Sequence, residues 1–578
     1  MRGAVIGEGR ALPGPFGPRP LVYADYVASG RSLDFIEAAL CRHALPVYGN
    51  THTETSFTGR ETTRLREMAR AAVKRAVGAD ARHAAIFAGS GATSAIDKLL
   101  RAMGLGGGDP AAPGQDRPVV FIGPYEHHSN DLPWREAAVE IERIPLCPDG
   151  RICFETLDAA LRRHAGAPRR IGAFSAASNV TGIKTDLRAL SSLLHRHDAL
   201  FFCDFAAAGP YTPIDMGESA PSARDHIDAL FLSPHKFIGG PGASGLLVCE
   251  RILLEGRPPS VSGGGTVSYV TGDRHTYVTD AERREEAGTP GILGDIRAGL
   301  VLELKSTIGA ERIEALEQRM VERALRAWGE EDTLRILGPG GSDRLAIFSF
   351  NIQAGEKALH HGFVTALLND LFGIQARAGC SCAGPYAHAL LGIDDERADR
   401  HAGLVAGGHS LMRPGWVRLG FNYFFDDETV DYLIEAVRFV ARHGAAFLPL
   451  YRVDPRAGQW SAERQAPRPA AAARRLADLW RDPDAPEPVA DAAPGFAECL
   501  AEAERLAAAG RLAAHGRLAG DGRNWRESAP DYAKAAALPR EAEDLRWFWL
   551  PEEAARALAR LCPPKNNEIP LAGDAKVC

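Results

Sequence analysis

Short apolar runs alternate with amphipathic stretches along the chain from about residue 60 to residue 250. Seven of the runs have the length and composition of β-strands: AAIFAG, PVVFIG, EIERIPL, RIGAFSAASN, ALFFCDFAAAG, DALFLS and SGLLVCE. The stretches between them, such as TTRLREMARAAVKRAVG and DLRALSSLLHRH, carry apolar residues at helical spacing. Strands and helices in alternation predict an α/β domain with a largely parallel sheet covered by helices on both faces.

The pattern changes twice further along the chain. A long helix is predicted in GTPGILGDIRAGLVLELKSTIG; from about residue 343, the run RLAIFSFNI, a helix over 359–372 and the helix ETVDYLIEAVRFVARHG indicate a smaller α+β domain. Beyond residue 453 the chain is rich in Ala and Arg. Helical periodicity there predicts helices in AAAARRLADLW, GFAECLAEAERLAAAGRLAAHG and EAEDLRWFWLPEEAARALARLC, which Pro-rich joints separate. We therefore expect four regions, which are an N-terminal segment 1–45 that packs with the small domain, a large domain 46–300, a small domain 301–453 and a helical extension 454–578.

Composition and charge argue against several classes of protein. The chain has 578 residues, of which 45% are hydrophobic and 24% charged, and its net charge is −7. Mild acidity with scattered Lys and Arg argues against a nucleic-acid partner, and no apolar run approaches the roughly 20 residues of a membrane span. The start is broken by Gly and Pro, unlike a secretion signal, and the ten cysteines are irregularly spaced. We therefore expect a cytoplasmic protein without a disulfide framework.

Lys236 stands between two apolar runs in DALFLSPHKFIGGPGASGLLV. A buried lysine is rare because its charge loses hydration, so it usually has a partner or takes part in a reaction. The predicted strand ALFFCD ends in Asp204, at the sheet edge where open α/β sheets bind ligands. Two interpretations fit this pair: a structural ion pair, or the Schiff-base lysine and ring-nitrogen partner of a pyridoxal phosphate site.

Three other predicted strand ends carry polar groups. FAGSGATSAIDKLL is a strand, a Gly/Ser/Thr turn and a helix, which suits a phosphate, although Ser and Thr also cap helices without any ligand. FIGPYEHHSNDLPW contains His127 and His128, which are either structural or able to stack on a flat cofactor. Asn179 in SAASNVTGI is either an ordinary turn residue or a donor to a phenolate oxygen.

The order of several segments carries a family resemblance. GSGATSAI, EHHSN, SNVTGI, CDFAAAG, SPHKFIGGPGASG, EEAGTPG and RAGCSCAG together resemble the fold-type I, class V aminotransferase-like enzymes, and among them cysteine desulfurases and selenocysteine lyases. The resemblance spans about residues 20–445, and SPHKFIGGPGASG and EEAGTPG are its most specific motifs. It implies a large domain that binds pyridoxal 5′-phosphate and a small domain that carries a cysteine loop.

The resemblance implies a role for each matching residue. Lys236 would hold the cofactor through a Schiff base, Asp204 would face the pyridinium nitrogen, and His127 would stack on the ring. Asn179 would lie near O3′ of the cofactor. The residues that would cradle the phosphate are Ala92, Thr93, Ser233 and His235. In this family the threonine of AGTP reaches the phosphate of the neighbouring subunit, so Thr289 implies a homodimer with shared active sites.

The resemblance also implies the substrate-binding residues. Arg377 matches the arginine that clamps the substrate carboxylate and Arg418 would assist it, because a guanidinium binds both carboxylate oxygens. Cys382 matches the nucleophile of the desulfurases. The catalytic residues would then be Cys382, Lys236 and His127. The Cys382 thiolate, formed with help from Arg377 or His388, would take the sulfur of L-cysteine as a persulfide and leave alanine. A sulfur-acceptor protein is then an expected partner.

The chain departs from the family pattern at several positions. Ala207 replaces a usual Gln or His, and Ala92 stands where a phosphate-binding threonine is common. Cys380 is an additional thiol that either relays sulfur or is inert. Between Cys382 and Arg418 the chain makes a long Gly- and His-rich excursion, which we expect to be a loop able to act as a lid.

Three functions remain open at this point. The first is a cysteine desulfurase acting through Cys382. The second is a pyridoxal phosphate-dependent C–S lyase, an epimerase or another enzyme of Cα/Cβ chemistry on a non-standard amino acid. The third is a non-catalytic scaffold in which Cys380, Cys382 and His388 bind metal or sense redox state; this set is short of the ligands of a structural zinc site, and we expect no metal. The extension is either a packing or oligomerisation element or a docking site for a sulfur acceptor.

Overall fold

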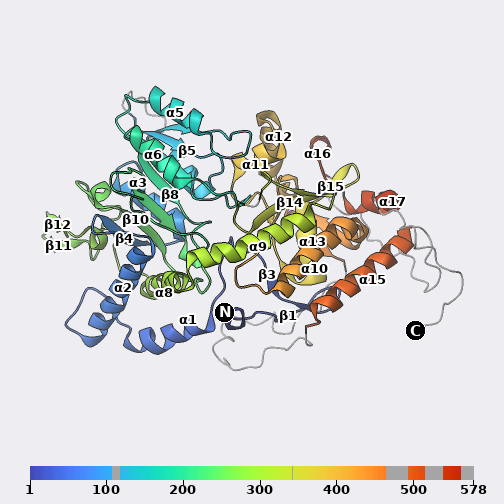
Figure 1. Cartoon of the computed structure of the whole chain (residues 1–578), viewed down its shortest axis with the longest axis horizontal. Helices are drawn as coiled ribbons and strands as arrows, with labels where there is room; N and C mark the ends of the chain where they lie inside the picture. Colours follow the sequence, from blue (N-terminus) through green and yellow to red (C-terminus); the bar gives the residue numbers. More distant parts are fainter. Residues whose placement is uncertain (107–116, 342, 464–492, 515–537, 562–578) are drawn as a thin grey trace.

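The computed structural model covers most of the chain (Figure 1). The residues that it describes are 1–106, 117–341, 343–463, 493–514 and 538–561. The predicted helix AAAARRLADLW and the Pro-rich joint that follows it lie outside the described residues.

A seven-stranded sheet forms the centre of the large domain, in the order β4-β10-β9-β8-β7-β5-β6. Its strands are β4 (His83–Ala88), β5 (Val119–Ile122), β6 (Glu140–Arg143), β7 (Arg170–Ser175), β8 (Leu200–Asp204), β9 (Ala229–Leu232) and β10 (Gly245–Glu250). β10 runs antiparallel to both neighbours, whereas β5 to β9 pair in parallel. Each predicted strand run overlaps one of these strands, so the predicted α/β architecture is confirmed.

Successive residues of these strands belong to two separate hydrophobic cores, one on each face of the sheet. In β8, Phe201 and Cys203 face the core that includes Leu190 of α6, whereas Phe202 faces the other core and stacks on Trp134. The first core is covered by α2 (Phe57–Ala76), α5 (Phe154–Arg163), α6 (Leu187–Arg196) and α8 (Ile292–Ile308), and the second by α3 (Gly91–Ala102) and α4 (Leu132–Arg135). Burial on both faces explains why the strands read as continuous apolar runs.

The small domain is built on a second sheet, in the order β13-β14-β18-β17, with β15 also paired to β14. Its strands are β13 (Leu334–Ile336), β14 (Ile347–Ala354), β15 (Lys357–Leu359), β17 (Arg377–Gly379) and β18 (Trp416–Gly420), and its long helices are α9 (Ala310–Trp328), α10 (His361–Phe372) and α13 (Asp427–Phe447). Figure 1 shows α9 running from the large domain towards α13. The helix predicted over 359–372 is therefore present as α10.

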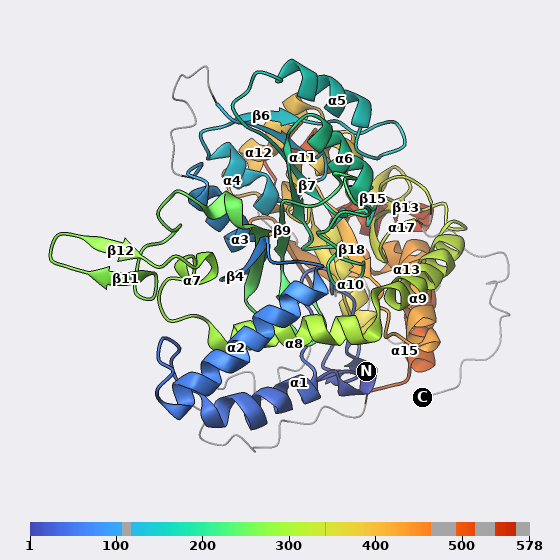
Figure 2. The same cartoon turned by 60° about the vertical axis from the view of Figure 1, so that its left-hand side comes forward.

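The N-terminal segment contacts both domains. β3 (Val22–Tyr23) pairs in parallel with β16 (Ile374–Gln375), which follows α10 of the small domain. The chain then continues into α1 (Asp34–Ala39), after which Leu40 and Ala44 pack against Ile292 and Ile296 of α8. Figure 2 shows α1, α2 and α8 close together at one side of the large domain.

The excursion between Cys382 and Arg418 is helical, so the expectation of a long loop is wrong. It forms α11 (Gly384–Leu391), α12 (Asp395–Ala406) and a short turn at Ser410–Met412. The residues that suggested a loop act at helix ends: Gly392 ends α11 with a φ of 64°, and the Asp394 side chain accepts from the backbone N–H of Arg397 at the start of α12. The buried His401 side chain lies 2.9 Å from the Met412 carbonyl oxygen through its Nδ1 atom.

The described parts of the extension pack on the small domain (Figure 1). α15 (Phe496–Ala514) stacks Phe496 on Tyr432 of α13, with ring centroids 4.0 Å apart. The helical prediction for EAEDLRWFWLPEEAARALARLC is only partly right, because α16 (Arg540–Glu543) and α17 (Pro551–Leu561) are separated by a non-helical stretch. There Ala358 of β15 donates to the Trp547 carbonyl and accepts from the Trp549 N–H, and Phe548 between them is fully buried. The backbone groups of β15 and the burial of Phe548 favour this extended pairing over a continuous helix.

Three short strand pairs complete the described fold. They are β1 (Ala11–Leu12) with β2 (Arg19–Pro20), β11 (Val267–Val270) with β12 (His275–Tyr277), and β19 (Tyr451–Asp454) with β20 (Gln459–Ala462). The β11–β12 hairpin projects from the large domain (Figure 2). Among the described helices, none has the length and apolarity needed to cross a membrane.

Candidate active site

A pocket of about 230 Å³ lies where the large-domain strands end and the small domain begins. Except for Thr289, every site residue predicted from the sequence lines it: Ala92, Thr93, His127, Asn179, Asp204, Ser233, His235, Lys236, Arg377, Cys382 and Arg418. Cys380 and His388 are not among the lining residues. The strands converge because parallel neighbours end at the same edge of the sheet, so their following loops meet there.

Lys236 and Asp204 come from adjacent strands of this edge. Asp204 is the last residue of β8, and Lys236 ends the short turn Pro234–Lys236 that follows β9. Burial raises the pKa of the Asp204 carboxyl, whose Oδ1 atom accepts from the Ala206 N–H at 2.7 Å. Burial lowers the pKa of Lys236 from 10.5 to about 8, against the opposing effect of the Asp204 charge. The pocket therefore contains an amine that is partly neutral at physiological pH.

His127 presents a neutral ring to the pocket. Its Nδ1 atom accepts a hydrogen bond from the Ser129 N–H at 3.1 Å. Burial, followed by the nearby Lys236 charge, lowers the pKa of His127 to about 3. A neutral imidazole is suited to lie against another flat ring without the cost of desolvating a charge.

The turn before α3 approaches the turn after β9 very closely. A Cβ atom added at Gly91 would lie 2.8 Å from Ser233 Oγ and 2.7 Å from His235 Cε1, and Gly91 has a φ of +66°. The Ala92 N–H donates to Ser233 Oγ at 3.0 Å, and Thr93 Oγ1 lies 2.6 Å from Ser129 Oγ. The start of α3 and these hydroxyl groups form a concave polar surface, which is typical of an anion site. Only glycine permits this approach at position 91.

The Cys382 loop is held in an unusual backbone conformation. Ser381 and Cys382 both have positive φ, at 54° and 56°. The His128 N–H donates to the Cys382 carbonyl at 2.8 Å, and Asn179 Nδ2 donates to the Ser381 carbonyl, also at 2.8 Å. Trp416 Nε1 donates to Ser381 Oγ at 3.3 Å. These bonds offset the cost of two left-handed residues and keep the exposed thiol of Cys382 at the pocket wall.

His128 and Asn179 make contacts that the sequence analysis did not predict. The second histidine of the pair, His128, binds the cysteine loop twice, because its Nε2 atom also accepts from the Gly384 N–H at 3.0 Å. Asn179 was expected to face a cofactor oxygen, and its amide nitrogen instead contacts Ser381. Its Oδ1 atom is buried and has no hydrogen-bond partner among the described residues. A contact between Asn179 and a cofactor stays a prediction.

Asp25 is a site residue that the sequence analysis missed. Its carboxylate accepts from Arg377 Nε at 2.8 Å and from Arg418 at 3.0 Å, and so joins both predicted carboxylate-binding arginines. Arg418 also donates to the Asn179 carbonyl at 3.1 Å and is 3% exposed, whereas the Arg377 side chain is 48% exposed. Arg377 therefore points its free donors to a solvent-accessible part of the pocket, while Arg418 is fixed behind it. The local sequence does not mark Asp25 as a site residue, because VYADYVASG contains one acidic residue and forms no recognised motif.

Replacing Asp25 by alanine is expected to lower the free energy of unfolding by about 3–5 kcal/mol, because the buried Arg418 guanidinium loses its charged partner. Urea-induced unfolding followed by circular dichroism measures this change. Asp34→Ala, at an exposed acidic position at the start of α1, is the matched control and is expected to change stability much less. Equal stability of the Asp25→Ala variant and the control would show that Arg418 does not depend on Asp25.

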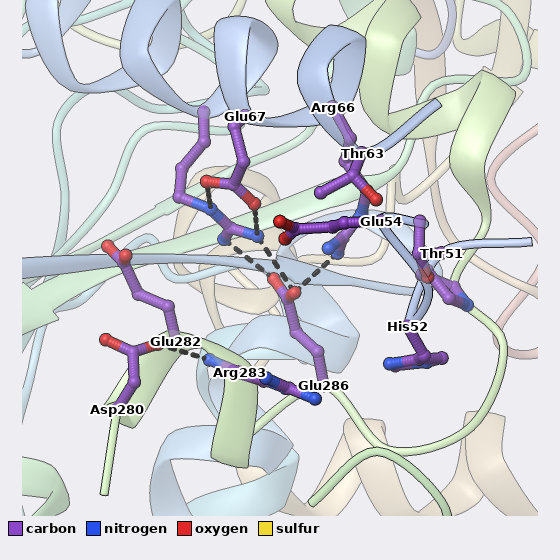
Figure 3. Close-up of a pocket in the computed structure, with 12 residues that line it drawn as sticks. Thr51, His52, Glu54, Thr63, Arg66, Glu67, Asp280, Glu282, Arg283 and Glu286 are labelled. Carbon is purple, nitrogen blue, oxygen red and sulfur yellow. Dashed lines mark hydrogen bonds and ion pairs between the residues drawn. The ribbon is translucent and has the colours of Figure 1, made fainter. Parts of the chain in front are cut away.

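Thr289 lies away from the pocket, beside a second cavity of about 610 Å³. Its hydroxyl lies 3.4 Å from Asn50 Nδ2. Figure 3 shows Glu286 at the centre of this cavity, pointing to Arg66. Glu286 also accepts from Arg70 and from the Phe87 N–H at 2.8 Å, so the segment before Thr289 is tied to the strand that leads into the anion turn. The role of Thr289 in a neighbouring subunit stays a prediction.

Comparisons with known proteins agree on one family. The family model described as Aminotransferase class-V matches residues 22–433. A cysteine desulfurase of Escherichia coli (strain K12 / DH10B) is 30% identical over 376 residues, which is 63% of this chain and 85% of that protein. The apo structure of the cysteine desulfurase from Thermococcus onnurineus NA1 has a TM-score of 0.59 at 23% identity, over 73% of this chain and 94% of that one. The cysteine desulfurase CsdA from Escherichia coli has a TM-score of 0.58 at 23% identity, over 76% and 96%. The two solved structures support the same fold.

Proposed function

The chain belongs to the aminotransferase class-V family, and on that premise we propose that it is a cysteine desulfurase. The family and the curated relatives indicate a pyridoxal phosphate-dependent enzyme of the cysteine desulfurase or C–S lyase kind. In the finer proposal, the enzyme removes sulfur from L-cysteine, carries it as a persulfide on Cys382 and releases alanine. The observation that carries this proposal is that the exposed thiol of Cys382 lines the same pocket as Lys236 and Arg377.

The pocket fits pyridoxal 5′-phosphate. Lys236 supplies an amine with a lowered pKa, Asp204 a carboxylate for the ring nitrogen, and His127 a neutral ring to stack on. The polar turn at the start of α3 suits the phosphate. When bound, the cofactor would act as an electron sink for charge that develops at the substrate Cα.

The chain's own residues account for the other requirements of the reaction. The free donors of Arg377 suit a substrate carboxylate, and Asp25 orients this arginine together with Arg418. Lys236, once neutral, can accept the Cα proton. The Cys382 thiolate attacks the substrate sulfur, so that an S–S bond forms while the Cβ–S bond breaks, and protonation at Cβ leaves alanine. Arg418 lines the same pocket as Cys382 and places a guanidinium there.

Product analysis tests this proposal against its main alternative. Holoenzyme incubated with L-cysteine and a dithiol reductant is expected to release alanine and sulfide in equal amounts. A C–S lyase would release pyruvate and ammonia with the sulfide, and an epimerase would release D-cysteine without sulfide. Either of those product sets would overturn the desulfurase proposal and leave the family assignment intact. The scaffold interpretation is set aside because the family is enzymatic.

The amine of Lys236 is expected to titrate near pH 8. Only the neutral amine can attack an aldehyde, so cofactor uptake by the apoprotein should rise with pH and level off above about 8 rather than near 10.5. The rate of absorbance change after addition of pyridoxal phosphate measures this profile, with Lys236→Ala as the baseline for other lysines. Because the Asp204 charge raises the pKa of Lys236, Asp204→Asn should move the midpoint to lower pH. A midpoint near 10 in the unmodified protein would contradict the burial of this amine.

The same proposal includes a homodimer with shared active sites, transfer of the sulfur to an acceptor protein, and a cytoplasmic location. The position of Thr289 outside its own pocket supports the homodimer, because a phosphate contact from this residue needs a second subunit. The packing of α15 and of Trp547–Trp549 on the small domain supports a structural role for the extension.

A further inference from the structure

Two cysteines, Cys147 and Cys153, lie diagonally across a tight antiparallel turn of the large domain, separate from the candidate active site. Leu146 and Ile152 form an antiparallel bridge, with the Cys147 N–H donating to the Arg151 carbonyl at 2.8 Å and the Cys153 N–H donating to the Pro145 carbonyl at 3.1 Å. The turn between them includes Gly150, which has a φ of 77°. Both thiols are partly exposed, and each shifts the pKa of the other.

The two thiols have different chemical environments. Cys153 is the N-cap of α5, where the free N–H groups and the helix dipole favour a negative charge. The Thr156 hydroxyl donates to Cys153 Sγ at 3.2 Å, and this bond lowers the pKa of Cys153. The neighbouring Cys153 side chain raises the pKa of Cys147 to about 11. The pKa of Cys153 is therefore lower than that of Cys147, which makes Cys153 the attacking thiol of the pair.

The turn rests on the first residues of the small domain, which restrict its movement. A Cβ atom added at Gly150 would lie 2.8 Å from Pro339 Cγ. Arg151 lies 3.6 Å from Asp343, which also pairs with Lys184 at 2.9 Å. These contacts hold the turn in place, so the segments that carry Cys147 and Cys153 stay paired.

We propose that Cys147 and Cys153 form a redox-active dithiol that reduces low-molecular-weight disulfides and is converted into an intramolecular disulfide. The Cys153 thiolate attacks one sulfur of the disulfide, which forms a mixed disulfide on Cys153 and releases one thiolate. Cys147 then gives up its proton and attacks Cys153 Sγ, which closes the protein disulfide and releases the second thiolate. The dithiol loses two electrons, and the small disulfide gains them as two thiols. This inference does not depend on the proposed desulfurase activity.

Glutathione disulfide added to the full-length protein is the probe, and mass spectrometry of the peptide that spans Cys147 and Cys153 is the readout. We expect this peptide to lose two hydrogen atoms, whereas exposed Cys41 should only accumulate a mixed disulfide, about tenfold more slowly. Cys147→Ser should stop at the mixed disulfide on Cys153. Cys153→Ser should leave Cys147 less reactive than Cys41.

The Thr156 contact provides a matched pair of variants. Thr156→Val removes the hydroxyl and should slow the reaction of Cys153, while Thr156→Ser keeps the hydroxyl and should preserve the rate. Melting curves of both variants verify that the fold is unchanged. The proposal is overturned if the peptide gains two separate mixed disulfides, if Cys153 reacts no faster than Cys41, or if neither thiol reacts.

Discussion

Replacing Cys382 by alanine is expected to reduce alanine formation from L-cysteine on the order of 10³-fold or more, because the variant has no thiol to take the sulfur. The absorbance of bound pyridoxal phosphate should be unchanged, since Lys236, Asp204 and His127 come from other elements than the cysteine loop. Alanine and sulfide are measured after incubation with a dithiol reductant, and the cofactor by its absorbance.

Cys380→Ala is the matched control for this experiment. Cys380 is two residues away on the same loop and does not line the pocket, so its removal should preserve most of the activity. Comparable loss in both variants would mean that the loop conformation, rather than the Cys382 thiol, limits turnover. Undiminished sulfide release by Cys382→Ala would refute the persulfide, and pyruvate in place of alanine among the products would favour the lyase alternative.

Replacing Lys236 by alanine is expected to remove covalent attachment of the cofactor and to lower turnover on the order of 10²–10⁴-fold, as for loss of a positioned general base. The physical reason is that the lowered pKa and the neighbouring Asp204 make Lys236 the amine in the pocket that is suited to the aldehyde. Borohydride reduction followed by peptide mapping locates the attached cofactor, and alanine formation measures turnover.

Lys184→Ala is the control for this variant. Lys184 pairs with Asp343 and Glu314 outside the pocket, so its removal should leave both the cofactor attachment and the turnover near their original values. Cofactor found on another lysine of the unmodified protein would exclude Lys236 as its attachment point, and with it the proposed arrangement of the site.

The two variants separate two parts of the mechanism. Lys236→Ala acts on the cofactor and therefore on every pyridoxal phosphate reaction that the pocket could support, including lyase and epimerase chemistry. Cys382→Ala acts only on the step in which sulfur moves to the protein. A protein that loses activity in the first variant and keeps it in the second would still be an enzyme of this family with a different reaction.

The central sheet was predictable because its strands are buried on both faces. Strands such as β8 and β9 must be apolar at nearly every position, which makes them stand out as short continuous runs. The predicted strand ends also located two site residues, because Asp204 ends β8 and Lys236 follows β9 in the chain. Local pattern and parallel topology together specify which loops meet.

The excursion after Cys382 and the WFWL stretch were predicted less well. Gly392 and Asp394 serve as helix ends in the structure, although glycine and aspartate are also common in loops. Trp547 and Trp549 pair in an extended conformation because the edge of β15 is available to them. The helical periodicity of their own segment does not reveal this distant pairing partner. Helix caps therefore decided for helix over loop in the excursion, and pairing with β15 decided for an extended chain over helix in the WFWL stretch.

The sequence by itself determined the α/β architecture, the Lys236–Asp204 pair and the polar residues of the turn before α3. Short contiguous segments specify these features, because a buried strand is apolar throughout and its polar groups follow directly at its end. Only the tertiary structure decided that Asp25 joins Arg377 to Arg418, that His128 holds the cysteine loop, and that Cys147 and Cys153 lie on paired segments of one turn. These contacts depend on distances between segments that are far apart or reversed by a turn, and such distances are set by packing rather than by local propensity.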